Sequence, residues 1–260
     1  MTRSRIALTI AGSDSGGGAG IQADLRVFTR LGVFGTTAIT AITAQNTRGV
    51  QSWTPVAPRL VRAQIDAVAA DLYPDAVKSG MLANASVVRV VAAALRTHDI
   101  RRYVLDPVIV SSSGTVLLDR DGVRALRRDL LPLATVVTPN LAEASALSGE
   151  PVTSIESMRR AALLLVDRDG AKAALITGGH LAGGSATDVF YDGKSAPRLI
   201  RHRRITTRHT HGTGCTLSAA IAAHLALGHS LPAAVTAAGR YVHRALLHPP
   251  SIGSGIGPVG

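Results

Sequence analysis

Apolar residues along this chain alternate between the spacing of strands and the spacing of helices. Short runs rich in Val, Ile and Leu have the length of buried strands, and the longer Ala-rich stretches between them have helical spacing. Strands are expected at 6–11, 36–43, 76–79, 103–105, 135–137 and 173–177. Helices are expected at 20–31, 57–72, 85–96, 121–131, 141–147, 154–168, 214–227 and 231–247. This alternation predicts an α/β protein built from βαβ units around a mostly parallel sheet.

Two segments interrupt the alternation. Residues 46–55 contain the only Trp, among Gly and Pro residues, and predict a small flap after the second strand. In 183–207, Asp-Gly at 192–193 separates two strand-like runs, which predicts a β-hairpin. The Gly- and Pro-rich residues 249–260 predict a loop or tail. No linker or repeat is visible, so we expect a single domain over 1–260.

Composition excludes several classes of protein. Hydrophobic residues make up 46% of the 260 positions and charged residues 17%, which excludes a disordered chain. No apolar run has the length of a membrane span or of a signal-peptide core, so we expect a cytoplasmic protein without a membrane partner. The single cysteine, Cys215, excludes an internal disulfide and a cysteine-based zinc site.

The charge balance of 28 basic to 17 acidic residues raises the question of nucleic acid. The basic residues are nearly all Arg and are scattered, without the interleaved aromatics on which a single strand would stack. Net charge alone indicates non-specific attraction and defines no site. We therefore expect no specific nucleic-acid partner.

The most informative motif is His-Gly-Thr-Gly-Cys-Thr at 211–216, directly before a predicted helix. Backbone amides in such a turn converge on an anion, and the helix dipole favours negative charge there. The same field would lower the pKa of Cys215 and favour a reactive thiolate. The alternative is a tight turn with a packed cysteine.

A second Gly-rich loop, 12–20, leaves the first predicted strand and opens the first helix, as a ligand loop does in α/β proteins. It has neither the P-loop ending nor the dinucleotide G-x-G-x-x-G spacing, so a dinucleotide enzyme is disfavoured. Asp24, one turn into the helix, either binds a ligand amino or hydroxyl group or complements the helix dipole.

Acidic residues follow two further strands. Asp106 comes after 103–105, and Asn140 with Glu143 comes after 135–137. Carboxylates at the carboxyl ends of parallel strands suit Mg²⁺. The alternative for Asn140 and Glu143 is a helix cap. Another glycine turn follows the strand 173–177.

These motifs together resemble one enzyme family over the whole chain. The matching segments are 11–25, 40–49, 78–82, 106–108, 138–143, 178–180, 210–220 and 255–259. The chain resembles the hydroxymethylpyrimidine and phosphomethylpyrimidine kinases of thiamine biosynthesis, within the ribokinase-like superfamily. The resemblance implies a three-layer α/β/α fold with a flap over the substrate. It also implies transfer of the ATP γ-phosphoryl group to 4-amino-5-hydroxymethyl-2-methylpyrimidine, and then to the monophosphate to give the diphosphate.

The resemblance also implies roles for individual residues. Cys215 is expected to be the base or the positioner of the substrate hydroxyl, beside an anion hole formed by the amides of Gly212, Thr213 and Gly214. The ring is expected at Gly12, Asp24, Gln45 and Met81, the nucleotide at Thr177 and Gly179, and Mg²⁺ at Asp106 and Glu143. A homodimer is left open.

The sequence departs from the family pattern where cations are expected near the nucleotide. Thr177 stands where a lysine is common, and the segment 111–114 lacks another. Arginines near the predicted hairpin are candidate replacements, at 198, 201, 203, 204 and 208. His209 stands where asparagine is usual. Two alternatives remain: a pyridoxal or pyridoxine kinase, against which the pair Gln45 and Asp24 argues, and a pyrimidine-binding sensor with weak catalysis.

Overall fold

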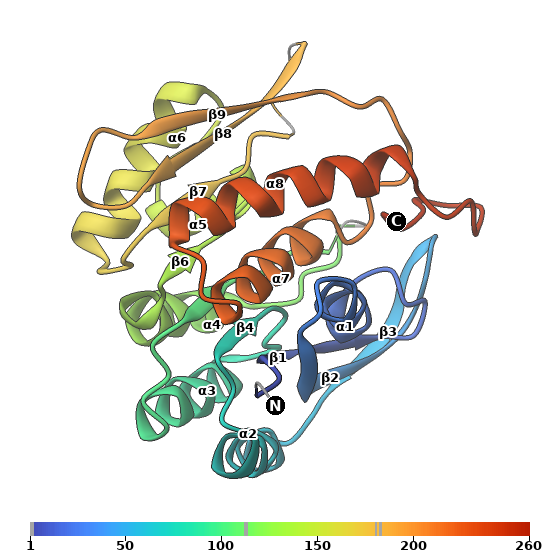
Figure 1. Cartoon of the computed structure of the whole chain (residues 1–260), viewed down its shortest axis with the longest axis vertical. Coiled ribbons are helices and arrows are strands. Elements are labelled where there is room, and N and C mark those ends of the chain that lie inside the picture. The colour runs from blue at the N-terminus through green and yellow to red at the C-terminus, as the bar shows by residue number, and fades with distance from the viewer. Residues whose placement is uncertain (1–2, 112–113, 180, 182–183) are drawn as a thin grey trace.

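The computed structural model describes residues 3–111, 114–179, 181 and 184–260. Within them, one nine-stranded sheet has the order β3-β2-β1-β4-β5-β6-β7-β8-β9 (Figure 1). The strands are β1 Ile6–Asp14, β2 Phe34–Asn46, β3 Gly49–Pro55, β4 Ala76–Ser79, β5 Tyr103–Leu105, β6 Val136–Val137, β7 Ala174–Ile176, β8 Ser185–Tyr191 and β9 Arg198–Arg203. All strands from β2 to β7 in this order are parallel, and β3, β8 and β9 pair antiparallel at the two edges. The mostly parallel sheet is confirmed.

The helices lie close to the predicted ranges. They are α1 Gly20–Arg30, α2 Pro58–Leu72, α3 Ala85–Thr97, α4 Arg120–Ala125, α5 Leu141–Ser148, α6 Ile155–Leu163, α7 Thr213–Ala226 and α8 Leu231–Leu247. Two predicted helices end irregularly, α4 through the π turn η1 Leu126–Leu130 and the 3-10 turn η2 Leu131–Leu133, and α6 through the π turn η3 Leu164–Arg168. Pro132 lacks the amide hydrogen that would continue an α-helix, which accounts for the tight end after η1. Among the described residues, no helix is both long and apolar enough to cross a membrane.

Helices cover both faces of the sheet, so the expected three layers are present (Figure 1). Neighbouring strand residues point to opposite faces. Leu8 and Leu105 pack into the core under α2, α3, α5 and α6. Ala7 and Val104, each one residue earlier, pack into the core under α1, α7 and α8. Ala, Val, Leu and Ile fill most of both cores, as the low aromatic content indicated.

The strand order locates a ligand crevice. The strands β1 and β4 are neighbours, but the chain leaves β1 for α1 on one face and leaves β4 for α3 on the other. Open α/β sheets bind ligands at such a switch point, outside the carboxyl ends of the strands. The residues around Gly12 and Met81 lie at these two ends.

The structure shows how the three segments outside the predicted alternation are folded. The flap segment 46–55 forms the tip of β2 and the edge strand β3. The hairpin is confirmed as β8 and β9 around Asp192-Gly193, although residue 183 lies outside the described residues. The tail is irregular but held: the amide of Ile256 donates to the carbonyl of Thr47 at the flap tip, at 2.8 Å. The carbonyl of Gly257 accepts the amide of His211 at 3.0 Å.

Candidate active site

The two Gly-rich segments come together at the amino end of α7. Gly212, the residue before α7, has a left-handed φ of 79°. A Cβ at this position would lie 2.0 Å from the carbonyl oxygen of Gly18, so glycine is required for the two segments to touch. The predicted loop 12–20 begins later than expected, because β1 continues through a register shift to Asp14, opposite Thr43 of β2.

Asp14 organises the first of these loops. Its carboxylate accepts backbone N–H groups from Gly16 at 2.8 Å, Gly18 at 3.0 Å and Ala19 at 2.8 Å. His211 Nε2 lies 3.0 Å from the same carboxylate. Burial opposes ionisation, but the hydrogen bonds from His211 and the amides outweigh it and lower the pKa of Asp14. Asp14 was not among the predicted site residues.

Open backbone amides are present at the start of α7. Among the described residues, the amides of Gly212, Gly214 and Cys215 have no hydrogen-bond partner. The amide of Thr213, the third member of the predicted anion hole, donates to the carbonyl of Thr210 at 3.2 Å. The cluster of open amides therefore includes Cys215 in place of Thr213, and it suits a phosphate oxygen.

The expectation of a reactive thiolate at Cys215 is wrong for the protein without ligands. Burial raises the pKa of the Cys215 thiol to about 12, and the carboxylates of Asp106 and Asp24 add to the effect. Lys78 and the amide of Gly20 oppose it without reversing it. Cys215 is therefore a neutral thiol at physiological pH, hydrogen-bonded to Asp106.

Beneath Cys215 lies a buried cluster of charges centred on Lys78, the one cation of β4. Its side chain is 0% exposed, and Nζ lies 2.8 Å from Asp24 Oδ2 and 3.8 Å from Asp106 Oδ2. Burial lowers the pKa of Lys78, but the charges of Asp24 and Asp106 and the hydrogen bond to Asp24 outweigh it and raise that pKa. Lys78 is thus a buried ammonium group.

Asp24 faces this lysine. Both of its oxygens accept hydrogen bonds from Lys78, and Oδ2 also accepts from Thr9 at 2.6 Å. The side chain is 0% exposed. In this arrangement the Asp24 carboxylate supports Lys78, and its predicted contact with the ring stays a prediction.

Asp106 and Glu143, the two predicted magnesium ligands, lie close enough for their charges to interact. Asp106 accepts a hydrogen bond from Ser218 at 2.9 Å. Glu143 belongs to a capping box with Asn140 at the start of α5, so the helix-cap interpretation is confirmed. Burial and the charge of Asp106 raise the pKa of Glu143 to about 8.

The pair fits magnesium in chemical type. Burial raises the pKa of both carboxyl groups, and the charge of Asp106 raises that of Glu143 further, so the pair gains from a cation. Hard oxygen ligands are those Mg²⁺ prefers. No group of three or more His, Cys, Asp or Glu side chains suited to a metal occurs in the part of the chain that the structure describes. Two carboxylates match an ion that keeps waters and binds substrate phosphates.

The remaining predicted ring contacts lie at the carboxyl ends of β1, β2 and β4. A Cβ on Gly12 would lie 3.0 Å from the sulfur of Met81, so these two residues are neighbours. The backbone of Gln45, on β2, is held by Ser15. Ser15 Oγ accepts a hydrogen bond from the backbone N–H of Gln45 and donates one to its backbone carbonyl, both at 2.8 Å. Gln45 Nε2 lies 3.0 Å from His211 Nε2.

The predicted nucleotide residues lie at the end of β7. The amide of Thr177 donates to the carbonyl of Pro139 at 2.9 Å, and Gly179 is exposed. Arg204 donates to the carbonyls of Gly179 at 2.7 Å and Leu181 at 2.5 Å. One candidate replacement for the absent lysines therefore lies at this loop. His180 and the segment 112–113 lie outside the described residues.

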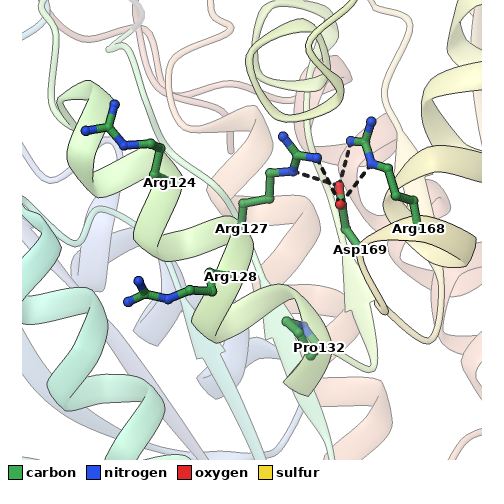
Figure 2. Close-up of a pocket in the computed structure, with 6 residues that line it drawn as sticks. All are labelled: Arg124, Arg127, Arg128, Pro132, Arg168 and Asp169. Carbon is green, nitrogen blue, oxygen red and sulfur yellow. Dashed lines mark hydrogen bonds and ion pairs between the residues drawn. The ribbon is translucent and has the colours of Figure 1, made fainter.

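A separate hollow of about 400 Å³ opens between α4, η1 and η3 (Figure 2). Arg127 and Arg168 both pair with Asp169, as Figure 2 shows. The other arginines at this hollow, Arg124 and Arg128, pair with Asp121 and Asp129. None of the predicted site residues lines it, and each of its four arginines already has an aspartate partner.

Comparison with known proteins decides the family. The family model described as phosphomethylpyrimidine kinase matches residues 14–260. This chain belongs to the phosphomethylpyrimidine kinase family. A relative from Rhizobium meliloti, named hydroxymethylpyrimidine/phosphomethylpyrimidine kinase, is 53% identical over 98% of this chain and 96% of its own length. The resemblance found in the sequence is confirmed.

Solved structures of phosphomethylpyrimidine kinases and of pyridoxal kinases share the fold. The phosphomethylpyrimidine kinase of Clostridium difficile has a TM-score of 0.82 at 37% identity, over 94% of this chain and all of that one. An ADP complex of Bacillus subtilis pyridoxal kinase has a TM-score of 0.92 at 38% identity, over 99% of this chain and 97% of that one. The ribokinase-like α/β fold is confirmed, and the homodimer stays a prediction.

Proposed function

We propose that this chain transfers the γ-phosphoryl group of ATP to the hydroxymethyl group of 4-amino-5-hydroxymethyl-2-methylpyrimidine. A second transfer to the monophosphate gives the diphosphate, a precursor for thiamine. The observation that carries the proposal is the half-buried Cys215, which lies among the open amides of α7 directly above Lys78 and Asp106. The names of the relatives, whose sequences match this chain over nearly its whole length, support the proposal.

In this proposal Cys215 positions the substrate hydroxyl. A thiol with a pKa of about 12 is a poor base at neutral pH, so it does not remove the proton before transfer. Phosphoryl transfer depends mainly on alignment and charge stabilisation, which a neutral hydrogen-bonding thiol can support. Of the two roles expected for Cys215, the pKa favours the positioner.

The open amides of Gly212, Gly214 and Cys215 receive the negative oxygens of the transferred phosphoryl group. The Lys78 ammonium partly offsets the charges of Asp24 and Asp106 in the same cluster. Asp106 and Glu143 would hold Mg²⁺, which supplies charge neutralisation for the phosphates when it is bound. Arg204 fixes the loop at Gly179 on the nucleotide side.

Product masses test the proposal. The purified protein is mixed with the hydroxymethylpyrimidine, ATP and magnesium, and pyridoxal replaces the pyrimidine in a parallel reaction. A diphosphate product supports both transfers and shows that the two absent lysines are dispensable. A protein that phosphorylates neither compound but binds the pyrimidine contradicts the proposal and favours the sensor.

Pyridoxal kinase is the second candidate, because a solved pyridoxal kinase has a TM-score of 0.92 to this chain. Both activities place a phosphoryl group on a hydroxymethyl substituent of a six-membered aromatic ring. Specificity constants measured side by side decide between them, and a preference for pyridoxal would reverse the assignment.

A further inference from the structure

His211 Nε2 lies between a hydrogen-bond acceptor, the Asp14 carboxylate, and a hydrogen-bond donor, the Gln45 side-chain amide nitrogen. His211 Nε2 lies 3.0 Å from Asp14 Oδ2 and 3.0 Å from Gln45 Nε2. A ring nitrogen either carries a hydrogen and donates it, or carries a lone pair and accepts. The carboxylate needs a donor and the amide nitrogen needs an acceptor, so Nε2 cannot satisfy both as they stand.

Asp14 decides which form is present. Its carboxylate already accepts three backbone N–H groups at 2.8 to 3.0 Å, an arrangement that stabilises the ionised form. The pKa of Asp14 is lowered accordingly. An ionised carboxylate at 3.0 Å requires a hydrogen on His211 Nε2. The contact with Gln45 Nε2 is then donor against donor.

A half-turn of the Gln45 amide group removes the conflict. The carbonyl oxygen Oε1 then faces His211 Nε2 and shares its one hydrogen with the Asp14 carboxylate. The NH2 group moves to the side where Thr43 Oγ lies 3.5 Å from the present amide oxygen. Thr43 gives its own hydrogen to the carbonyl of Ser13 at 3.0 Å, so its lone pairs can accept from the NH2 group. All of these polar groups are then satisfied.

Neither partner can easily move away. The backbone of Gln45 is held on both sides by Ser15 Oγ. The backbone of His211 is held by Gly257 and Val259 of the tail, at 3.0 and 3.2 Å. The His211 ring occupies the space a side chain at residue 18 would need, since a Cβ on Gly18 would lie 2.3 Å from Cδ2 of the ring.

We propose that His211 is a positioning residue that holds the Gln45 amide with its oxygen toward His211, so that the NH2 group beside Thr43 is the part offered to the substrate ring. This rests on the proposed function, in which Gln45 reads the amino edge of the pyrimidine. The locked NH2 group selects rings whose nitrogen beside the 4-substituent carries a lone pair. A 4-aminopyrimidine has such a nitrogen, whereas the corresponding 4-pyrimidinone carries N–H there.

The lock should appear as discrimination between these two rings. A buried N–H facing another N–H leaves both unsatisfied, which costs about 1 to 3 kcal/mol or roughly ten- to hundredfold in affinity. If the amide could turn freely, its oxygen would face the pyrimidinone N–H and most of this preference would vanish.

The test is a double-mutant cycle read as a ratio. Dissociation constants of 4-amino-5-hydroxymethyl-2-methylpyrimidine and its 4-oxo counterpart are measured by calorimetry, and kcat/KM with ATP is measured for each. His211→Phe keeps a ring beside Gly18 but cannot hydrogen-bond, and we expect it to lower the amino-to-oxo preference about tenfold. In the Gln45→Leu background the same change should leave the preference as it is. His229→Phe, at an exposed position beyond α7, should preserve the wild-type ratio.

The outcomes separate this inference from the proposed function. A protein that prefers the amino compound in binding but does not phosphorylate it contradicts the kinase and leaves the lock supported. A wild-type preference near one overturns the lock, as does a loss in His211→Phe that persists in the Gln45→Leu background. A structural role for His211 alone would weaken both compounds equally and leave the ratio unchanged, which also overturns it.

Discussion

The predicted substrate half and the predicted nucleotide half of the site are built differently. In the predicted substrate half, Lys78, Asp24 and Asp106 are at most 4% exposed, and their side chains hold one another. At the predicted nucleotide end, Gly179 is exposed, and Arg204, the residue after β9, donates hydrogen bonds to the backbone carbonyls of Gly179 and Leu181. A buried network constrains each member, whereas a backbone contact can be supplied from more than one element. This difference explains how the chain can lack two expected lysines and still present a cation near Gly179.

The largest expected effect comes from breaking the buried half. Lys78→Met leaves Asp24 and Asp106 without their cation, and we expect a loss of about 3 to 5 kcal/mol in the free energy of unfolding. Urea denaturation at pH 7 measures it. Lys194→Met, at an exposed position, is the matched control. Adding Asp24→Leu to Lys78→Met should recover part of the loss, and a single-variant loss below about 1 kcal/mol would contradict a charged Lys78.

Cys215→Ala tests the reacting end of the same half. We expect turnover at saturating substrate to fall at least about tenfold, because the hydroxyl loses its positioning group. Folding should be retained, as judged by circular dichroism and urea denaturation. Because its pKa is about 12, the wild-type thiol should also react slowly with iodoacetamide at pH 7. An unchanged turnover number would remove Cys215 from the reaction.

Arg204→Ala probes the nucleotide half and should have a milder effect. Losing its bonds to Gly179 and Leu181 loosens the loop, which we expect to raise the KM for ATP about two- to tenfold. The turnover number should change little, because the substrate half is untouched. Arg203→Ala, at the exposed last residue of β9 next to Arg204, is the control. A fall in turnover at saturating ATP would show that the two halves are not independent.

The last prediction concerns the dependence of stability on pH. The pKa of Glu143 is about 8 in the folded protein against 4.5 for an ordinary glutamate, so the folded state holds a proton that the unfolded state releases between these values. This contribution to stability is complete below about pH 4.5 and is lost as pH rises through 8. Glu143→Gln should remove that part of the decline between pH 5 and 8 in denaturation curves. A decline as steep in the variant would contradict the raised pKa.

Much of the site could be predicted because its parts follow strands. Asp106, Glu143 and Cys215 each come directly after a strand or at a helix start, and chain order alone places such positions at one edge of a parallel sheet. Lys78 lay inside the matching segment 78–82 without a predicted role, although a lone lysine in an apolar strand is a signal of a buried ion pair. Asp14 and His211 gave no such signal, since a loop acid and a histidine before a helix have many ordinary uses.

Spacing and composition by themselves determined the α/β class, the order of the elements and the hairpin at Asp192-Gly193. These depend on local periods and backbone conformation, which are written along the chain. Only the tertiary structure decided the charge states: Cys215 is a neutral thiol, Lys78 a buried ammonium and Asp24 its partner. A pKa depends on burial and on charges a few ångströms away, and residues that are 54 or 197 positions apart in sequence supply those charges.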